Sequence, residues 1–452
     1  MSSAATEIAI IGGGPAGSLL AILLARRKLN PVVFERSARF SEDGMAGGRS
    51  INLALAARGI EALRRAGVDA DVDKLLLPMR GRMLHDLESK QRFLAYGQRS
   101  GEQIYSISRA ALNTLLYRLA AERYGVEYRF EHRCLGIDPA TGRPLVQSLS
   151  GTGPLTAQVV FAADGAGSDM RRALVQAESI EATEELLDHG YKELTIPAAG
   201  AEHGFVFEPK ALHIWPRGGF MLIALPNPDR SFTATLFLPH RGDPSFASIG
   251  AHTVRAFFQR EFPDVTPLMP ALDTDYRSHP TGVLGSVYCR PWSFNARILL
   301  IGDAAHAIVP FHGQGMNAAF EDCIELDRLI GRQQSNGRYD WAEVFAQFER
   351  QRAPNTRAIA EMAIENYQEM RDDVRDPKFQ LRADLSFELE RRFAGRFIPR
   401  YSMVMFHPEI PYAEAQRRGA IQSDILKQLT HTAGALSEVD FVLAARLVET
   451  AL

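Results

Sequence analysis

The sequence predicts an α/β protein built from a parallel-sheet domain, an inserted antiparallel β-sheet domain and a C-terminal helical layer. Three observations predict this architecture. The chain begins with a strand, a glycine-rich turn, a helix and a second strand; short strands separated by turns fill the stretch from about 190 to 240; and nearly everything after Tyr339 has helical patterning. Because 452 residues exceed one ordinary hydrophobic core, we expect two or three domains.

The first elements follow from their residue pattern. Glu7 to Ile11 is a short apolar run that predicts a strand, Pro15 to Arg27 predicts a helix, and the β-branched Pro31 to Glu35 predicts a second strand. Leu53 to Ala66 and Arg109 to Tyr124 also have helical patterning. The opening strand–helix–strand unit is Rossmann-like.

The turn between the first strand and the first helix carries Gly12, Gly14 and Gly17. Glycines at this spacing allow a tight turn whose backbone N–H groups approach a pyrophosphate at a helix N-terminus. Glu35 stands 18 residues after Gly17, about the interval at which an acid meets a ribose hydroxyl. Strand, helix and acid together predict a dinucleotide site, with Arg36 over the adenine end or in a solvated loop.

Two distant segments narrow the choice of dinucleotide. Asp164-Gly165 follows an apolar run in the middle of the chain, and Gly302-Asp303 follows a strand predicted from Ala296 to Ile301. Asp303 can accept hydrogen bonds from ribityl hydroxyls, unless it is an N-cap aspartate without a ligand. A helix predicted from Gly315 to Ile330 can direct its N–H groups to the N1–C2=O edge of a flavin. A glycine turn combined with a distant Gly-Asp pair indicates FAD more often than NAD.

Two β-rich segments interrupt this pattern. Arg82 to Asp86 and Arg92 to Tyr96 predict a hairpin around Ser89, which places Arg82 and Tyr96 directly opposite each other. Three further strands predict an antiparallel meander: Leu212 to Trp215, Phe220 to Leu225 and Ser231 to Leu238.

The elements divide the chain into three predicted domains. The FAD-binding domain comprises residues 1–78, 99–180 and 284–336, and the β-sheet substrate domain comprises residues 79–98 and 181–283. The C-terminal helical domain comprises residues 337–452 and is broken at Pro377, Pro399 and Pro411.

Composition excludes several classes of partner. The net charge of −3 and the absence of a basic block argue against nucleic acid and anionic membranes. The three cysteines, Cys134, Cys289 and Cys323, have no metal-type spacing and are too sparse for a disulfide framework, so we expect no metal and a reducing compartment. No apolar stretch approaches the roughly 20 residues of a bilayer span. We therefore expect a cytoplasmic protein, and a homodimer is the assembly that we consider.

Longer strings resemble one family of enzymes. The three glycine-bearing segments together are similar to the single-component FAD-dependent aromatic hydroxylases. More specific strings resemble the kynurenine 3-monooxygenases within that group, and they cover nearly the whole chain. These strings are Gly48 to Leu55, Met79 to Met83, Ala211 to Pro216, Val309 to Asn317, Glu365 to Tyr367 and Pro399 to Met403.

The resemblance implies a soluble bacterial member, because eukaryotic members carry a C-terminal hydrophobic anchor that this chain lacks. It implies hydroxylation of L-kynurenine to 3-hydroxykynurenine, with FAD as cofactor and with NADPH and O₂ as co-substrates. A flavin C4a-hydroperoxide would deliver the oxygen. The preference for NADPH is implied by the family alone. The family also adds residues to the cofactor site, namely Ala16, Ala54, Arg109, Gly315, Met316 and Asn317.

The amino-acid tail of kynurenine calls for a planar cation, since a guanidinium can donate two hydrogen bonds to one carboxylate. The pattern alone favours a surface position for Arg82 on its hairpin. The resemblance implies instead that Arg82 and Tyr96 bind the carboxylate and that Asn366 and Tyr401 complete the contacts. Without the resemblance, Asn366 would belong to a packed helical face with Met370.

The aromatic ring of the substrate calls for an apolar pocket. Positions 221, 223 and 225 alternate along one predicted strand and therefore share a sheet face. Pro310, Phe311 and His312 form the predicted catalytic segment beside the flavin, where His312 is either a general base or a residue that contributes backbone placement alone. The expected pocket residues, some of which are ordinary core in the alternative reading, are Leu212, Met221, Ile223, Leu225, Phe237, Phe311 and Met370.

Three other functions fit parts of the pattern. A related hydroxylase could act on a hydroxybenzoate or an anthranilate, which lack the amino-acid tail. An FAD-fold carrier protein would have lost the cofactor and would purify colourless. A flavin-dependent dehydrogenase would form product without oxygen.

Overall fold

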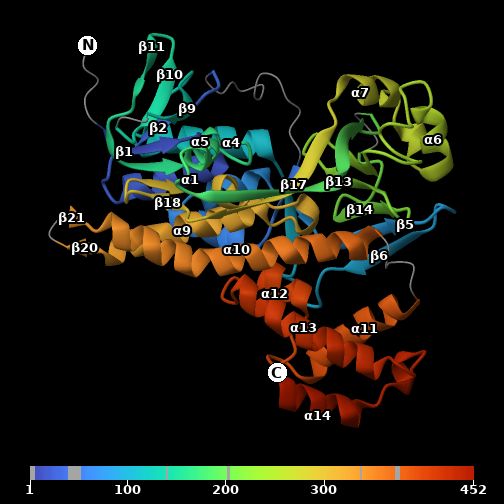
Figure 1. Ribbon diagram of the computed structural model, residues 1–452. Coiled ribbons are helices and arrows are strands. Elements are labelled where there is room, and N and C mark those ends of the chain that lie inside the picture. Colours follow the sequence, from blue (N-terminus) through green and yellow to red (C-terminus); the bar gives the residue numbers. More distant parts are fainter. Residues whose placement is uncertain (1–5, 39–51, 139–140, 201–203, 336–337, 372–376) are drawn as a thin grey trace. The chain divides into compact units, whose positions relative to one another are not determined.

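The opening strand–turn–helix–strand unit forms as its residue pattern predicts. The computed structural model describes residues 6–38, 52–138, 141–200, 204–335, 338–371 and 377–452 (Figure 1). β1 (Thr6–Ile11) and β2 (Val32–Phe34) are parallel neighbours, and α1 (Pro15–Arg26) connects them. Ile8 to Ile11 of β1 and all of β2 are apolar and buried, which is typical of a parallel sheet covered on both faces.

The chain divides into two compact units, each assembled from segments that are distant in the sequence. Unit 1 comprises residues 1–76, 107–186 and 285–360, and unit 2 comprises residues 77–106, 187–284 and 361–452. Four elements continue from one unit into the other: β7 (Ile104–Ser108), β13 (Glu181–Ile196), β17 (Gly282–Arg290) and α10 (Trp341–Arg371). The architecture is α/β as predicted, while the three-domain division stays a prediction.

Unit 1 contains a mainly parallel sheet with helices packed beside it. The remaining elements of this unit are β3 (Asn52–Leu55), α2 (Ala57–Ala66), α3 (Asp69–Val72), α4 (Arg109–Arg118), β8 (Glu127–Arg129), β9 (Arg133–Ile137), β10 (Pro144–Ser148), β11 (Gly151–Pro154), β12 (Ala157–Ala162), α5 (Asp169–Gln176), β18 (Ser293–Phe294), β19 (Ile298–Leu300), α8 (Asp303–His306), α9 (Gly315–Arg332), β20 (Gln334–Ser335) and β21 (Arg338–Tyr339).

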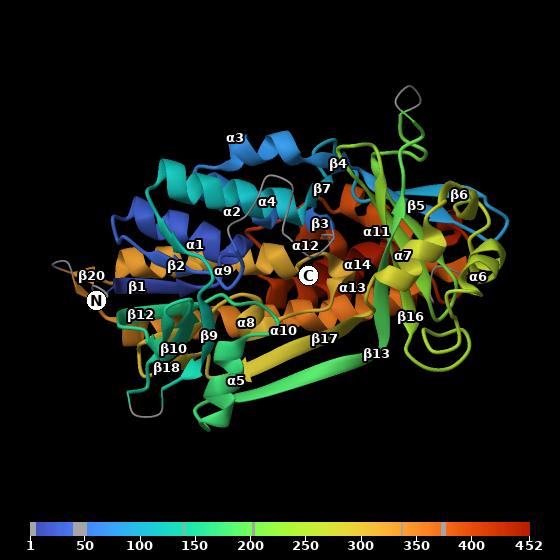
Figure 2. The same cartoon turned by 90° about the horizontal axis from the view of Figure 1, so that it is seen from above.

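The main sheet of unit 1 has six strands in the order β18-β19-β12-β1-β2-β8. All neighbours are parallel except β18 and β19. α1 packs against α4 and α9, and α2 also packs against α9 (Figure 2). β9, β10 and β11 form a separate three-stranded antiparallel sheet.

One predicted helix boundary is wrong. The helix expected from Leu53 to Ala66 begins only at Ala57, and the residues before it form β3. The reason is a tertiary contact that no local pattern contains. The Asn317 amide donates to Ala54 O at 2.9 Å and accepts from Ala56 N at 2.9 Å, so these backbone groups bond to a distant side chain and not to a helical turn.

Unit 2 is organised around a seven-stranded sheet that joins the predicted hairpin to the predicted meander. The bounds of its elements are β4 (Leu77–Met79), β5 (Gly81–His85), β6 (Gln91–Ala95), β7 (Ile104–Ser108), β14 (Ala211–Pro216), β15 (Met221–Pro226), β16 (Phe232–Pro239), α6 (Val254–Glu261) and α7 (Leu272–Ser278). The strand order is β17-β13-β16-β15-β14-β5-β6, with β5 parallel to β14 and the other pairs within the meander and the hairpin antiparallel.

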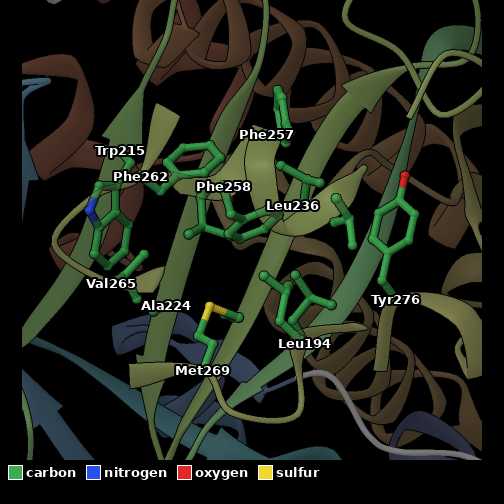
Figure 3. Packing of buried hydrophobic residues seen from close by; sticks show 14 of the residues in the cluster. Leu194, Trp215, Ala224, Leu236, Phe257, Phe258, Phe262, Val265, Met269 and Tyr276 are labelled. Atoms are coloured by element: carbon green, nitrogen blue, oxygen red, sulfur yellow. The ribbon is translucent and has the colours of Figure 1, made fainter. Parts of the chain in front are cut away.

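One face of the seven-stranded sheet carries the main core of unit 2. Trp215 and Leu236 of the strands pack in one cluster with Phe258 of α6 (Figure 3). Leu222 and Leu272 belong to the same cluster, and all five side chains are buried. Residues of a strand alternate between faces, so the neighbours of these strand residues belong to the opposite face. That opposite face carries the predicted substrate residues.

The C-terminal part of unit 2 is helical, as its pattern predicts. Leu385, Leu389, Ile425 and Val448 are among the residues of a core that these helices share. Pro399 and Pro411 are N-caps, and Pro377 begins a helix, as expected of prolines that cannot continue one. Within the described ranges, no helix has both the length and the hydropathy needed to cross a bilayer. The helices are α11 (Pro377–Arg392), α12 (Arg400–Phe406), α13 (Tyr412–Leu429) and α14 (Phe441–Ala451).

Candidate functional site

The three glycine-bearing segments meet at one edge of the parallel sheet of unit 1. The glycine turn follows β1, Asp164 follows β12, and Gly302-Asp303 follows β19. These strands are neighbours, and their ends coincide because Ile11 is paired with Ala162 and Ala162 with Leu300. Ligands of open α/β sheets bind at this carboxyl edge.

The glycine turn leaves no room for side chains at two positions. Gly12 has a φ of 100°, and a Cβ on it would lie 2.4 Å from Ala163 O. A Cβ on Gly17 would lie 2.0 Å from Gly12 O. Gly14 is the N-cap of α1, which has no side-chain cap and no acid in its first turn. A helix N-terminus of this kind is suited to an anion such as a pyrophosphate.

Two predicted acids also hold the surrounding backbone in place. Glu35 accepts hydrogen bonds from Gly13 N at 2.7 Å and from Ser37 N at 2.8 Å. Asp164 accepts a hydrogen bond from Ser168 Oγ at 2.6 Å, and burial raises the pKa of its carboxyl. Both acids therefore have protein partners, and contact with a ribose would share the same oxygens.

Asp303 differs from these acids. It begins α8 and is half-buried, and within the described ranges its carboxylate makes no hydrogen bond or ion pair. Burial raises the pKa of the carboxyl, while His306 and Arg109 lower it in part. Donors such as ribityl hydroxyls would favour its charged form.

Asn317 fixes the loop that precedes α9. Its Nδ2 donates to Gly313 O at 2.8 Å in addition to its contacts with Ala54 and Ala56. A Cβ on Gly313, whose φ is 63°, would lie 2.9 Å from Ala54 Cβ. Residues 315–317 open α9, so Asn317 holds Ala54, Gly313 and the helix start together.

The predicted catalytic segment is a single 3₁₀ turn over Pro310–His312. Phe311 and His312 are buried, and Pro310 is exposed. Gly313 ends the turn in the left-handed region and is bonded to the Asn317 amide. The position of the turn is therefore set by backbone contacts.

A cavity in unit 1 brings several predicted cofactor residues together. Asn113, which the sequence pattern missed, also lines it. Ala16 lies nearby, with its Cβ 3.8 Å from a Cβ position on Gly302. The string from Gly48 to Ile51 lies outside the described residues. The predicted residues that line the cavity are Gly12, Gly14, Glu35, Arg36, Arg109 and Asp164.

These features fit FAD. The glycine turn and the uncapped start of α1 suit the pyrophosphate, Glu35 and Arg36 suit the adenosine end, and Asp303 suits the ribityl chain. Bound FAD supplies redox chemistry and oxygen activation that no side chain provides.

In unit 2, the hairpin register differs from the expectation. Arg82 is paired with Leu94 and not with Tyr96, because the turn is centred one residue earlier than Ser89. Ser89 has a φ of 63° and is the last residue of the turn. Its backbone N–H closes the turn by donating a hydrogen bond to Asp86 O. The left-handed residue thus ends the turn and does not lie at its centre. Tyr96 becomes a diagonal neighbour of Arg82 on the same face.

Arg82 lies against two stacked tyrosines. Its Cζ is 4.7 Å from the ring centroid of Tyr401 and 5.7 Å from that of Tyr96, and the two rings are 5.4 Å apart with an interplanar angle of 13°. Burial raises the pKa of both phenols, so they remain neutral donors near neutral pH. Burial lowers the pKa of the Arg82 guanidinium, whereas Tyr401, Tyr96 and Glu369 raise it, and the net direction is upward.

The polar atoms of this cluster are incompletely satisfied. Within the described ranges, Arg82 Nε and the Tyr96 hydroxyl are buried without a hydrogen-bond partner, and Arg82 has no ion pair. Burying a cation without an anion is unfavourable. The cluster is therefore suited to a carboxylate ligand that accepts from Arg82 and Tyr96.

The predicted pocket residues share the sheet face of Arg82. Leu212 is paired with Arg82 across β14 and β5, and Met221 with Phe237 across β15 and β16. Ile223 and Leu225 follow Met221 at alternate positions of β15. The sequence correctly grouped Met221, Ile223 and Leu225, because alternation along a strand fixes their common direction.

The predicted helical residues are buried in unit 2. Asn366 and Met370 are 5% exposed, and Asn366 Nδ2 donates to Met370 Sδ at 3.2 Å. Both stand near the C-terminal end of α10, while Tyr401 belongs to α12. Of the four residues expected at the substrate tail, the structure brings Arg82, Tyr96 and Tyr401 into direct contact.

Sequence reasoning missed a buried polar chain on the other face of the sheet. His85 Nδ1 is 2.6 Å from Asp264 Oδ2, and His85 Nε2 is 2.8 Å from His213 Nδ1. His213 Nε2 donates to Glu208 O at 2.8 Å, since a carbonyl can only accept. Burial lowers the pKa of His213 to about 4. The sequence pattern could not predict this series of hydrogen bonds, because its three side chains come from distant segments.

The lowered pKa of His213 predicts that unit 2 becomes less stable in acid. Its folded-state pKa of about 4 lies below its usual 6.5, so the unfolded chain binds the proton more readily. Stability is therefore lost as pH falls from 6.5 toward 4, by about 2 kcal/mol between pH 7 and pH 5. Urea unfolding of His213→Gln should show a pH dependence weaker by this amount. The exposed His431→Gln is the control, and equal pH dependence in the two variants would contradict the assignment.

Comparison with known proteins agrees with the geometry. The family described as "FAD binding domain" matches residues 5–362. The chain is 46% identical to a kynurenine 3-monooxygenase of Stenotrophomonas maltophilia, covering 98% of this chain and 96% of that protein. It is 43% identical to a kynurenine 3-monooxygenase of Myxococcus xanthus, covering 98% and 95%.

Solved structures show the same fold at low identity. The tetrameric form of 2-methyl-3-hydroxypyridine-5-carboxylic acid oxygenase has a TM-score of 0.64 at 19% identity, covering 83% of this chain and 95% of that one. The p-nitrophenol 4-monooxygenase PnpA from Pseudomonas putida DLL-E4 has a TM-score of 0.65 at 17% identity, covering 85% and 94%. Family, fold and cofactor site agree: this chain is an FAD-dependent monooxygenase and belongs to the kynurenine 3-monooxygenase family.

Proposed function

We propose that this protein hydroxylates L-kynurenine to 3-hydroxykynurenine with NADPH and O₂ as co-substrates. The observation that carries the proposal is the Arg82, Tyr96 and Tyr401 cluster of unit 2. Arg82 is a partly buried cation, and within the described residues its Nε and the Tyr96 hydroxyl are buried without a hydrogen-bond partner. Relatives at 43–46% identity carry the name kynurenine 3-monooxygenase. A substrate with a free amino-acid tail supplies the anion that the cluster lacks.

The tail would be bound through charge-assisted hydrogen bonds. Arg82 would donate to the carboxylate and Tyr96 would donate its hydroxyl, while Tyr401 would cover the guanidinium with its ring. Such bonds to charged groups contribute about 1.5–3 kcal/mol each. Asn366 is the further polar residue that we assign to the tail, as the resemblance implies.

The aromatic ring would lie on the apolar sheet face of Leu212, Met221 and Phe237. An amino group ortho to the ketone already enriches the ring carbon that is hydroxylated, so the side chains need only orient the ring and exclude water. FAD bound in unit 1 would supply the redox chemistry with NADPH and O₂ that the side chains lack. We assign Pro310, Phe311 and His312 to placing the backbone beside the flavin.

The test is NADPH oxidation by the purified yellow protein, with and without L-kynurenine, with the product identified by mass. We expect kynurenine to stimulate NADPH oxidation and to gain one oxygen atom, with the product matching authentic 3-hydroxykynurenine. Stimulated oxidation that yields only hydrogen peroxide would show that kynurenine is a mimic, and hydroxybenzoates and anthranilate would then be tested. Absence of stimulation would contradict the assigned tail site.

A further inference from the structure

Asn113 combines burial, a position on the cofactor cavity and an unsatisfied polar atom. It is 3% exposed, and it lines the cavity that also contains Gly12, Glu35 and Asp164. Within the described ranges, its Oδ1 is buried without a hydrogen-bond partner. Arg109 stands four residues earlier on α4 and lines the same cavity, so the two side chains share one face of this helix.

A partnerless amide is an unfavourable choice for this position in the protein alone. The neighbouring positions of α4, Leu112 and Leu116, are fully buried and apolar. An apolar residue at 113 would pack there without the cost of removing an amide oxygen from water. Asn317, the comparable buried amide on α9, has three backbone partners. The contrast indicates that the hydrogen-bond partner of the Asn113 amide oxygen is a bound ligand.

We propose that Asn113 is a cofactor-binding residue whose amide oxygen accepts a hydrogen bond from an O–H or N–H group of FAD. Glu35 and the glycine turn line the same cavity, so the FAD groups that can donate a hydrogen bond there are the ribose hydroxyls and the adenine amino group. The inference depends on FAD binding, which the family establishes, and not on the identity of the substrate.

The test uses Asn113→Leu, which nearly preserves volume and removes the acceptor. Two readouts are measured without turnover: the thermal midpoint of the apo-protein, and the FAD dissociation constant from flavin fluorescence. We expect the apo-protein midpoint to stay the same or rise, because an unsatisfied buried group is gone. FAD should bind about tenfold more weakly, because one hydrogen bond is lost. FAD affinity should therefore fall without any fall in the midpoint of the apo-protein.

Asn317→Leu is the matched control. It makes the same substitution at a buried amide whose partners are all backbone groups, so its apo-protein midpoint should fall. A fall of the apo-protein midpoint in Asn113→Leu as well would mark Asn113 as structural and overturn the proposal. Unchanged FAD affinity would overturn it too. If the leucine variant does not fold, Asn113→Ala is measured with the same readouts, and FAD affinity within twofold of the parent would overturn the proposal.

Discussion

Arg82→Gln is expected to lower kcat/KM for L-kynurenine by roughly 100-fold, because losing a charge-assisted pair of hydrogen bonds costs about 3 kcal/mol. The effect should fall mainly on KM, since the carboxylate is bound equally in the ground state and the transition state. Glutamine retains a polar side chain but carries no charge and cannot form the two-pronged contact. Steady-state product formation over a range of kynurenine concentrations measures both parameters.

A substrate that lacks the amino-acid tail distinguishes a loss of tail binding from a general loss of activity in Arg82→Gln. An ortho-amino phenyl ketone that lacks the amino-acid tail should be handled equally by the parent protein and by Arg82→Gln. Arg80→Gln is the matched control, because Arg80 is exposed and its carbonyl, not its side chain, contacts Tyr96. If Arg82→Gln impaired both substrates alike, or released FAD, the assignment of Arg82 to the tail would be wrong.

The cofactor edge could be predicted because each of its parts has a local signature. Gly12 and Asp303 follow apolar strands, and neighbouring parallel strands bring their carboxyl ends to one edge whatever the length of chain between them. The same kind of rule grouped Met221, Ile223 and Leu225 on one sheet face, since alternation needs only the strand positions.

The remaining features depend on contacts that no local pattern encodes. The hairpin register was misplaced because it is set by the left-handed φ of Ser89 at the end of the turn. The stacking of Tyr96 on Tyr401 depends on how α12 packs within unit 2. The unsatisfied oxygen of Asn113 is a property of packing alone, because an asparagine in a helix has the same sequence pattern with or without a partner.

Gly17→Ala is expected to yield a protein that purifies nearly colourless. The new Cβ would lie 2.0 Å from Gly12 O, which is a backbone atom and cannot swing aside. Displacing the glycine turn costs about 3 kcal/mol and should weaken FAD binding roughly 100-fold. The ratio of flavin absorbance to protein absorbance after purification, together with an FAD titration of the apo-protein, measures the loss.

Gly14→Ala is the matched control within the same turn. Its Cβ would have no heavy atom within 4 Å, and its φ of −68° suits alanine, so the apo-protein should be at least as stable as the parent. Any loss of FAD affinity in Gly14→Ala would then report close approach of the pyrophosphate itself. Gly17→Ala should lower apo-protein stability and FAD affinity together, because its clash lies within the chain. If Gly17→Ala retained the flavin content of the parent protein, the glycine turn would not be the pyrophosphate site.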